Sequence, residues 1–134
     1  MPEFDSRTSL ETADRLFRAV EAGDVEALRS IYASDAVIWH NTDDKTESRE
    51  QNLETLLAFV ALSHNRTYAE IRREPTPRGF VQQHALRAQL KNGRELMLPA
   101  CIICEVRNER ITRLDEYFDT APLAALRNDP LSER

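Results

Sequence analysis

The fold is decided by residues 80–93, which read FVQQHALRAQLKNG. From Phe80 to Leu90 the more apolar residues recur at every second position, a period that is typical of a strand with one buried face. Asn92-Gly93 follows at once, and this dipeptide is the strongest short-range signal for a hairpin. A second strand is therefore expected over Leu96–Arg107.

Further strands are predicted on both sides of this hairpin. Thr67–Glu74 is a moderate strand candidate that ends at the breaker Pro75–Gly79. After a turn near Asn108, residues Arg110–Phe118 predict the last strand, and a short helical tail begins at Asp119.

The first half of the chain has helical periodicity instead. Thr8 and Glu11 form a capping box, with Thr8 as the N-cap, and Gly23 is a good helix stop. Asp24 can cap a second, short helix. The next segment, residues 36–40, is β-branched and aromatic and predicts a strand.

A third helix is predicted after a polar loop over Asn41–Glu47. Ser48 and Gln51 form its capping box, and the helix ends near His64. Its apolar face is predicted to hold Leu53, Leu56, Leu57, Val60 and Ala61.

The order α-α-β-α-β-β-β-β predicts an α+β fold. Three helices should pack on one face of one curved, mainly antiparallel sheet. The chain shows no internal repeat or linker, so a single domain is expected over residues 1–134, with a tail that is loosely ordered from about residue 127.

Composition excludes several classes of protein. Lys and Arg number 18 against 23 Asp and Glu, and a net charge of −5 argues against nucleic acid as a partner. The longest apolar run, Leu56–Leu62, is far shorter than the ~20 residues that span a bilayer. Met1–Asp5 has neither the basic start nor the apolar stretch of a signal peptide, so a cytoplasmic location is expected.

The cysteines and histidines give no sign of a metal or redox site. Cys101 and Cys104 fall inside a predicted strand, where residues three apart point to opposite faces, so both are expected to be free thiols. Neither a His-x-His nor a His-Glu-x-x-His pattern occurs. The sequence therefore predicts no metal and no cofactor.

Three segments resemble one fold family. They are the helix-break-helix run Ala19–Asp24, the strand Tyr32–Asn41 and the last strand Ile111–Asp119. Together they resemble the nuclear transport factor 2-like superfamily, also called SnoaL-like or ketosteroid isomerase-like. The resemblance implies a cone-shaped α+β barrel whose mouth accepts a small, mostly apolar molecule. Polar residues that point inward are then the functional candidates.

Comparison with ketosteroid isomerases implies a changed active site. The resemblance places His40 at the position of the base, Leu16 at that of the helix tyrosine, and Ile102 at that of the second acid. The groups that stabilise a developing enolate would then be absent.

Comparison with limonene epoxide hydrolases implies that half of the machinery is present. Glu116 aligns with the base, and Asn41 aligns with the residue that holds the water if one residue is inserted. Ala85 and Arg87 fall where an Arg-x-Asp pair supplies the acid, so His84 would have to serve. In the SnoaL-type cyclases, Glu116 or Asp115 could act as the general acid or base.

The residues themselves point to the same group of candidates. Glu116 lies between Leu114 and Phe118 on one face of its strand, where poor solvation makes a carboxylate a better base near neutral pH. His40 has the ordinary imidazole pKa range for proton transfer, and anchoring of the following loop is the alternative.

Gln82 and His84 share the more apolar face of their strand. That face should therefore line the cone. The alignment with the hydrolases instead turns Ala85 and Arg87 inward. The hydrophobic pattern favours the arrangement in which Gln82 and His84 point inward.

The polar residues expected inside the apolar cone favour a cofactor-independent general acid/base enzyme, such as an isomerase, a cyclase or an epoxide hydrolase-like protein. Its substrate would be a small apolar or polycyclic molecule. The predicted catalytic residues are Glu116, His40 and His84, and the predicted substrate-binding residues are Asn41, Gln82, Trp39, Leu16, Phe17, Phe59, Ile102 and Phe118. A non-catalytic carrier of a hydrophobic ligand and a dimeric association module are the alternatives.

A homodimer is expected through the sheet. The reverse faces of the strands carry Val81, Ala85, Met97, Cys101 and Ile103, which are apolar enough to be buried between two copies.

Overall fold

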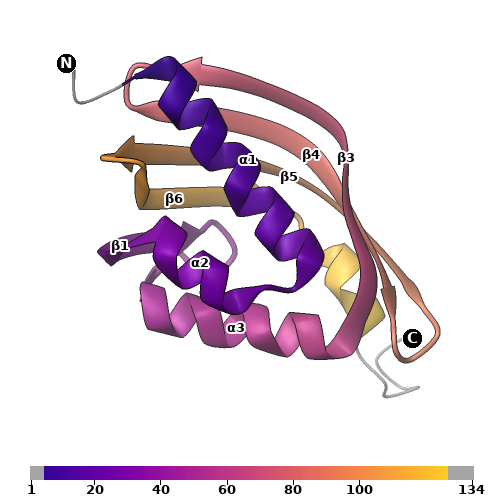
Figure 1. The fold of residues 1–134 in the computed structure, drawn as a ribbon. Helices are drawn as coiled ribbons and strands as arrows, with labels where there is room; N and C mark the ends of the chain where they lie inside the picture. The colour runs from indigo at the N-terminus through magenta and orange to yellow at the C-terminus, as the bar shows by residue number, and fades with distance from the viewer. Residues whose placement is uncertain (1–4, 127–134) are drawn as a thin grey trace.

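The structure, a computed structural model, describes residues 5–126, and Figure 1 shows their arrangement. The elements in chain order are α1 (Ser6–Ala22), α2 (Val25–Ile31), β1 (Tyr32–His40), β2 (Lys45–Ser48), α3 (Arg49–Leu62), β3 (Ser63–Thr76), β4 (Gly79–Leu90), β5 (Glu95–Arg107), β6 (Arg110–Phe118) and the 3₁₀ helix η1 (Ala121–Leu126). The predicted α+β class is confirmed. The predicted loose tail from about residue 127 lies outside the described residues.

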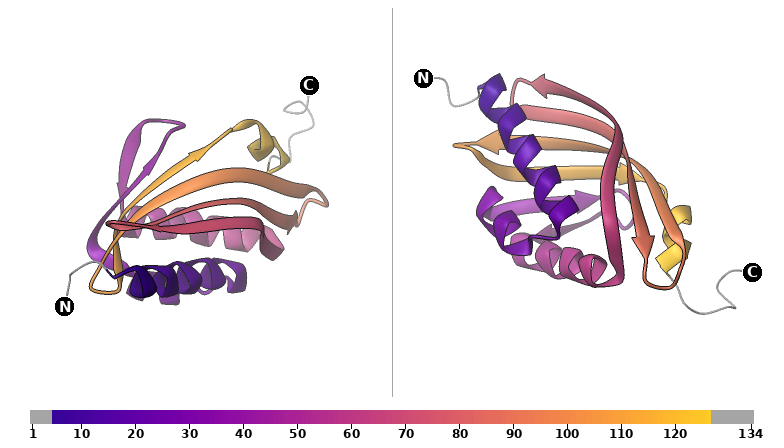
Figure 2. Two further views of the ribbon diagram at one scale, coloured as in Figure 1. Left: turned by 90° about the horizontal axis from the view of Figure 1, so that it is seen from above. Right: turned by 45° about the vertical axis from the view of Figure 1, so that its right-hand side comes forward.

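One curved sheet forms the frame of the described chain. Its strands run in the order β2-β1-β6-β5-β4-β3, so the sheet is open at β2 and β3. The β1–β6 pair is parallel and the other four pairs are antiparallel. The helices α1, α2 and α3 all lie on one face, which we call the inner face (Figure 2). The opposite side is called the outer face.

The inner face and α1 form the core. Leu16, Phe17 and Val20 recur at helical spacing on α1 and are buried against Phe80 and Ile102 of the sheet. Burial of such side chains is the main favourable contribution to folding, at about 25 cal/mol per Å² of apolar surface. The periodicity of the sequence therefore places both layers correctly.

The helix ends follow their capping residues, with one exception. Gly23 adopts the left-handed conformation at φ 72°, and Asp24 caps α2, as predicted. The capping box of Ser48 and Gln51 is also confirmed. The predicted N-cap at Thr8 is wrong, because Asp5 accepts a hydrogen bond from the Arg7 N–H at 2.9 Å and begins α1 earlier.

The predicted loop over Asn41–Glu47 is wrong in its second half. Residues from Lys45 onward form β2, which pairs with β1 in the register Val37↔Ser48 and Trp39↔Thr46. A strand of four residues is too short to show a period of its own. Pairing with β1 creates this strand, and its polar residues suit an edge.

The predicted inner face of β4 is confirmed. Phe80, Gln82 and His84 are buried, whereas Arg87 is exposed. The alternative register turned Ala85 and Arg87 inward. Ala85 is buried as well, but Arg87 is exposed and the His84 ring packs against Phe17 of α1, so His84 is the inward residue and that register is wrong. Cys104 is buried and Cys101 is half-buried, and both thiols are free as predicted.

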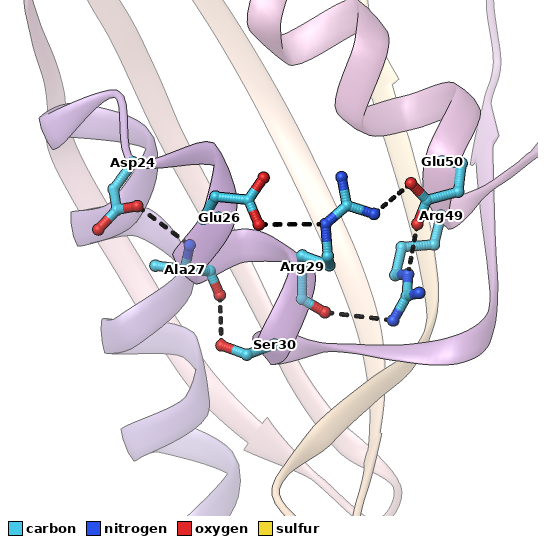
Figure 3. Close-up of polar contacts among 7 residues, drawn as sticks. All are labelled: Asp24, Glu26, Ala27, Arg29, Ser30, Arg49 and Glu50. Carbon is cyan, nitrogen blue, oxygen red and sulfur yellow. Dashed lines mark hydrogen bonds and ion pairs between the residues drawn. The ribbon is translucent and has the colours of Figure 1, made fainter.

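An ion network joins α2 to the start of α3 (Figure 3). The Arg29 guanidinium contacts both Glu26 and Glu50, and Arg49 pairs with Glu50 and donates to the Arg29 carbonyl oxygen. The hydrogen bond to Arg29 is the main cause that lowers the pKa of Glu50. These contacts fix the first turn of α3, which carries residues of the cavity described below.

Candidate functional site

A cavity of about 260 Å³ lies between the inner face of the sheet, α1, α3 and η1. Its walls are largely apolar: Leu16, Phe17, Val20, Leu56, Phe59, Leu86, Leu96, Leu98, Ile102, Leu114, Phe118, Leu123 and Leu126. The polar lining consists of Tyr32, His40, Asn52, Thr55, Tyr68 and Glu116. A mostly apolar hollow with a few converging polar groups is the usual form of a small-molecule site.

Strand register brings His40 and Glu116 together. His40 is the last residue of β1 and pairs in parallel with Glu116 of β6, and Glu116 pairs in turn with Ile102 of β5. Neighbours in register point to the same face of a sheet. Two predicted catalytic residues and one predicted binding residue therefore share one wall of the cavity.

The His40 imidazole lies between two carboxylates. Its Nε2 is 3.3 Å from Glu116 Oε1, and its Nδ1 is 3.6 Å from Glu47 Oε1. Interaction with Glu116 is the main cause that raises the pKa of His40 above its ordinary 6.5; the charges of Glu116 and Glu47 add to this, and partial burial opposes it. The two carboxylates therefore favour the protonated form of the imidazole.

Glu47 is a functional candidate that the sequence analysis missed. Its carboxylate oxygens lie 3.4 Å from Asn52 Nδ2 and 3.5 Å from Thr55 Oγ1, both on α3. Asn52 in turn accepts a hydrogen bond from the buried Tyr32 hydroxyl at 3.1 Å. Helix α3 therefore orients Glu47 toward His40. The signal available in the sequence was Asn52, a polar residue one position before Leu53 on the buried side of a helix.

Asn41 and Trp39 lie away from the cavity lining. The Asn41 side chain accepts from the Phe118 N–H at 2.9 Å and thereby ties the end of β1 to β6. Trp39 alternates with His40 along β1, so it projects to the outer face, where its ring packs edge-on against Tyr117 and its N–H donates to Asp44.

Gln82 and His84 are inward-facing, as the hydrophobic pattern predicts, but they lie outside the cavity lining. Arg73 Nε donates to Gln82 Oε1 at 2.6 Å, and Gln82 Nε2 lies 2.9 Å from His84 Nδ1. The His84 ring packs edge-on against Phe17 and Tyr68, two residues of the cavity wall. His84 therefore supports the wall from behind.

Burial of His84 makes the free energy of unfolding depend on pH. Desolvation lowers the pKa of His84 to about 4, against 6.5 in the unfolded chain. Between these values the unfolded state binds more protons, so stability present above pH 6.5 is lost as the pH falls toward 4. We expect this group to contribute on the order of 3 kcal/mol to that loss.

The His84→Gln variant, which does not titrate, should lose less stability across this window than the wild type. Urea unfolding of the wild type and of the variant, at pH 7 and at pH 4.5, measures the two losses of stability. Equal losses in the two proteins would show that His84 does not cause this pH dependence.

Two features are absent from residues 5–126. No three His, Cys, Asp or Glu side chains are arranged there to hold a metal ion. Within the same range, no helix is long and apolar enough to cross a membrane.

Solved structures of related shape include proteins of several activities. An epoxide hydrolase of M. tuberculosis described as LEH-like shares 14% identity at a TM-score of 0.72, covering 86% of this chain and 85% of that one. IdmH, a proposed polyketide cyclase from Streptomyces antibioticus, shares 20% identity at 0.75, covering 88% and 96%. A Catenulispora acidiphila protein with a ketosteroid isomerase-like fold, in complex with trimethylamine, shares 17% identity at 0.76, covering 92% and 96%.

The TM-scores show a common fold. No curated protein sequence matches the chain significantly. The family model for the SnoaL-like domain matches residues 13–114, which is most of the chain. The chain therefore belongs to the SnoaL-like domain family.

Proposed function

We propose that the protein is a cofactor-independent enzyme that moves a proton to or from a small, mostly apolar substrate. The observation that carries the proposal is the pair of Glu116 and His40, 3.3 Å apart in the wall of an otherwise apolar cavity. A carboxylate and an imidazole within hydrogen-bond reach are the groups that general acid/base catalysis uses most.

The two side chains take different roles. Glu116 lies between Leu114 and Phe118 in the cavity lining and acts as the base. His40, whose protonated form is favoured by its carboxylate neighbours, acts as the acid or orients the Glu116 carboxylate. Glu47 fixes the imidazole through its Nδ1, as a carboxylate commonly does for a catalytic histidine.

The carboxylate, the imidazole and the apolar cavity together suggest the reaction class. A base, an acid and an apolar cavity suit isomerisation, cyclisation or epoxide opening, and two structures of the same fold are named an epoxide hydrolase and a proposed polyketide cyclase. The names support an enzymatic role for this chain. Substrate identity is a separate question, since one fold hosts many activities.

Turnover of simple probes tests the proposal. The wild-type protein is incubated in D₂O with the ketone 1-tetralone, and separately with cyclohexene oxide. NMR should show protein-dependent deuterium exchange next to the carbonyl, or diol formation from the epoxide. Binding of a probe without turnover of either one would contradict the proposal and favour a carrier.

The carrier is the second candidate because the cavity wall is so largely apolar. A cavity of this size also fits a ligand-binding protein better than a pure association module, in which side chains would fill the space. The homodimer and the cytoplasmic location stay predictions. The outer face does expose Met97, Ile103 and Tyr117 by 41–47%, and we propose a second copy of the chain as the partner.

A further inference from the structure

The cavity contains one hydroxyl group that its neighbours leave unused. Tyr68 of β3 lines the cavity, and within residues 5–126 its hydroxyl has no hydrogen-bond partner, whereas its backbone N–H donates to Glu21 Oε2 at 2.9 Å. The other tyrosine of the lining, Tyr32, donates its hydroxyl to Asn52. The two phenols therefore differ: one is committed to the fold and the other is available.

The free hydroxyl of Tyr68 borders the open space of the cavity. In the described part of the chain, every fully buried side-chain N or O atom has a hydrogen-bond partner. An unpartnered Tyr68 Oη is therefore accessible to a small molecule. Its pKa is raised mainly by burial and next by the charge of Glu116, which lies in the same lining, so the group remains a protonated donor in neutral solution.

The ring that carries this hydroxyl is held in place. Tyr68 packs edge-on against Phe17 at 4.8 Å and against His84 at 4.6 Å between ring centroids. His84 is fixed in turn by Gln82 and Arg73. A donor on an immobilised ring loses little entropy when it binds a ligand, which is what preorganised recognition requires.

The size of the cavity limits the ligand. An engineered apolar cavity of about 150 Å³ takes benzene. The present cavity, at about 260 Å³, has room for one or two fused rings, which is the small end of the apolar and polycyclic substrates that the sequence allows.

We propose that Tyr68 is the residue that selects the ligand, by donating its hydroxyl to an oxygen on a neutral molecule of one or two rings. This inference rests on the proposed function for the location of the site, but it concerns binding and not proton transfer. In the ligand-free protein both ring nitrogens of His40 face carboxylates, so the Tyr68 hydroxyl is the donor that is free to bind a carbonyl or similar oxygen before any proton is transferred.

Binding of two matched probes tests the inference. 1-Tetralone and tetralin share a bicyclic body, and only the first carries a carbonyl oxygen. NMR titration of the wild type should show 1-tetralone binding roughly 2- to 10-fold more tightly than tetralin, as one neutral hydrogen bond provides. In Tyr68→Phe the preference should vanish through weaker binding of the ketone, with tetralin unchanged.

Three controls make the outcome decisive. Tyr117→Phe removes a phenol hydroxyl from the outer face and should keep the preference. Glu116→Gln should also keep it, so a failure of the proposed base does not affect this test. The three-ring ketone anthrone should bind much more weakly than 1-tetralone.

The inference is overturned if Tyr68→Phe, with an unchanged urea midpoint, retains the preference for the ketone. It is equally overturned if Glu116→Gln abolishes the preference, if anthrone binds as well as 1-tetralone, or if the folded wild type binds neither bicyclic probe up to its solubility limit.

Discussion

Replacement of Glu116 by Gln should lower the rate of proton transfer by about 100-fold or more, which is the usual contribution of a general base. The amide has nearly the shape of the carboxylate and can still contact His40 Nε2, but it cannot accept a proton at neutral pH. The cavity and its apolar lining should be unchanged. Deuterium exchange of 1-tetralone, or of any substrate found later, measures the effect.

The matched control is the neighbouring carboxylate. Asp115 alternates with Glu116 along β6, faces outward and accepts from Arg113 Nε at 2.9 Å. Asp115→Asn should retain most of the activity. A Glu116→Gln protein with full activity, or an equal loss in Asp115→Asn, would remove Glu116 from the role of base.

Replacement of Arg66 by Met should destabilise the fold by about 3 kcal/mol. The Arg66 guanidinium donates to the Val20 carbonyl oxygen at the end of α1 at 3.0 Å. It also donates to the carbonyl oxygens of Val60 and Ser63, near the end of α3, at 3.5 and 2.9 Å. One side chain thus caps the carboxyl ends of two helices, where a positive charge is favoured.

Methionine keeps much of the stem of Arg66 but leaves these half-buried carbonyl groups without their donor. We expect the urea midpoint to fall by more than about 1 M. Arg87→Met is the control, since Arg87 is exposed on the outer face of β4 and should change stability by less than about 0.5 kcal/mol. Similar midpoints for the two variants would show that the Arg66 contacts add little.

Local signals in the sequence were sufficient for most elements. The period of two over Phe80–Leu90 identified the buried face of β4, because side chains alternate strictly along a strand. Gly23 and the Ser48 capping box marked helix ends through hydrogen bonds within a few residues. The failure at Thr8 has the same local origin, since Asp5 offered a competing cap.

Longer-range features of the site were beyond these signals. The sequence predicts a loop at Glu47 because β2 exists only through its pairing with β1. Leu57 was expected in the apolar face of α3 but is 57% exposed, whereas Asn52 is buried where it meets the Tyr32 hydroxyl. A polar residue becomes acceptable inside when a distant partner satisfies it, and periodicity does not record that partner.

The sequence by itself determined the fold class, most of the helix and strand positions and the inner face of β4. These properties depend on hydrophobic period and on local hydrogen bonds, which neighbours in the chain control. Only the tertiary structure decided that Glu47 completes the environment of His40, that His84 lies behind the wall, and that Tyr68 has a free hydroxyl. Such facts depend on which strands pair and how far they curve, and therefore on contacts between residues far apart in the chain.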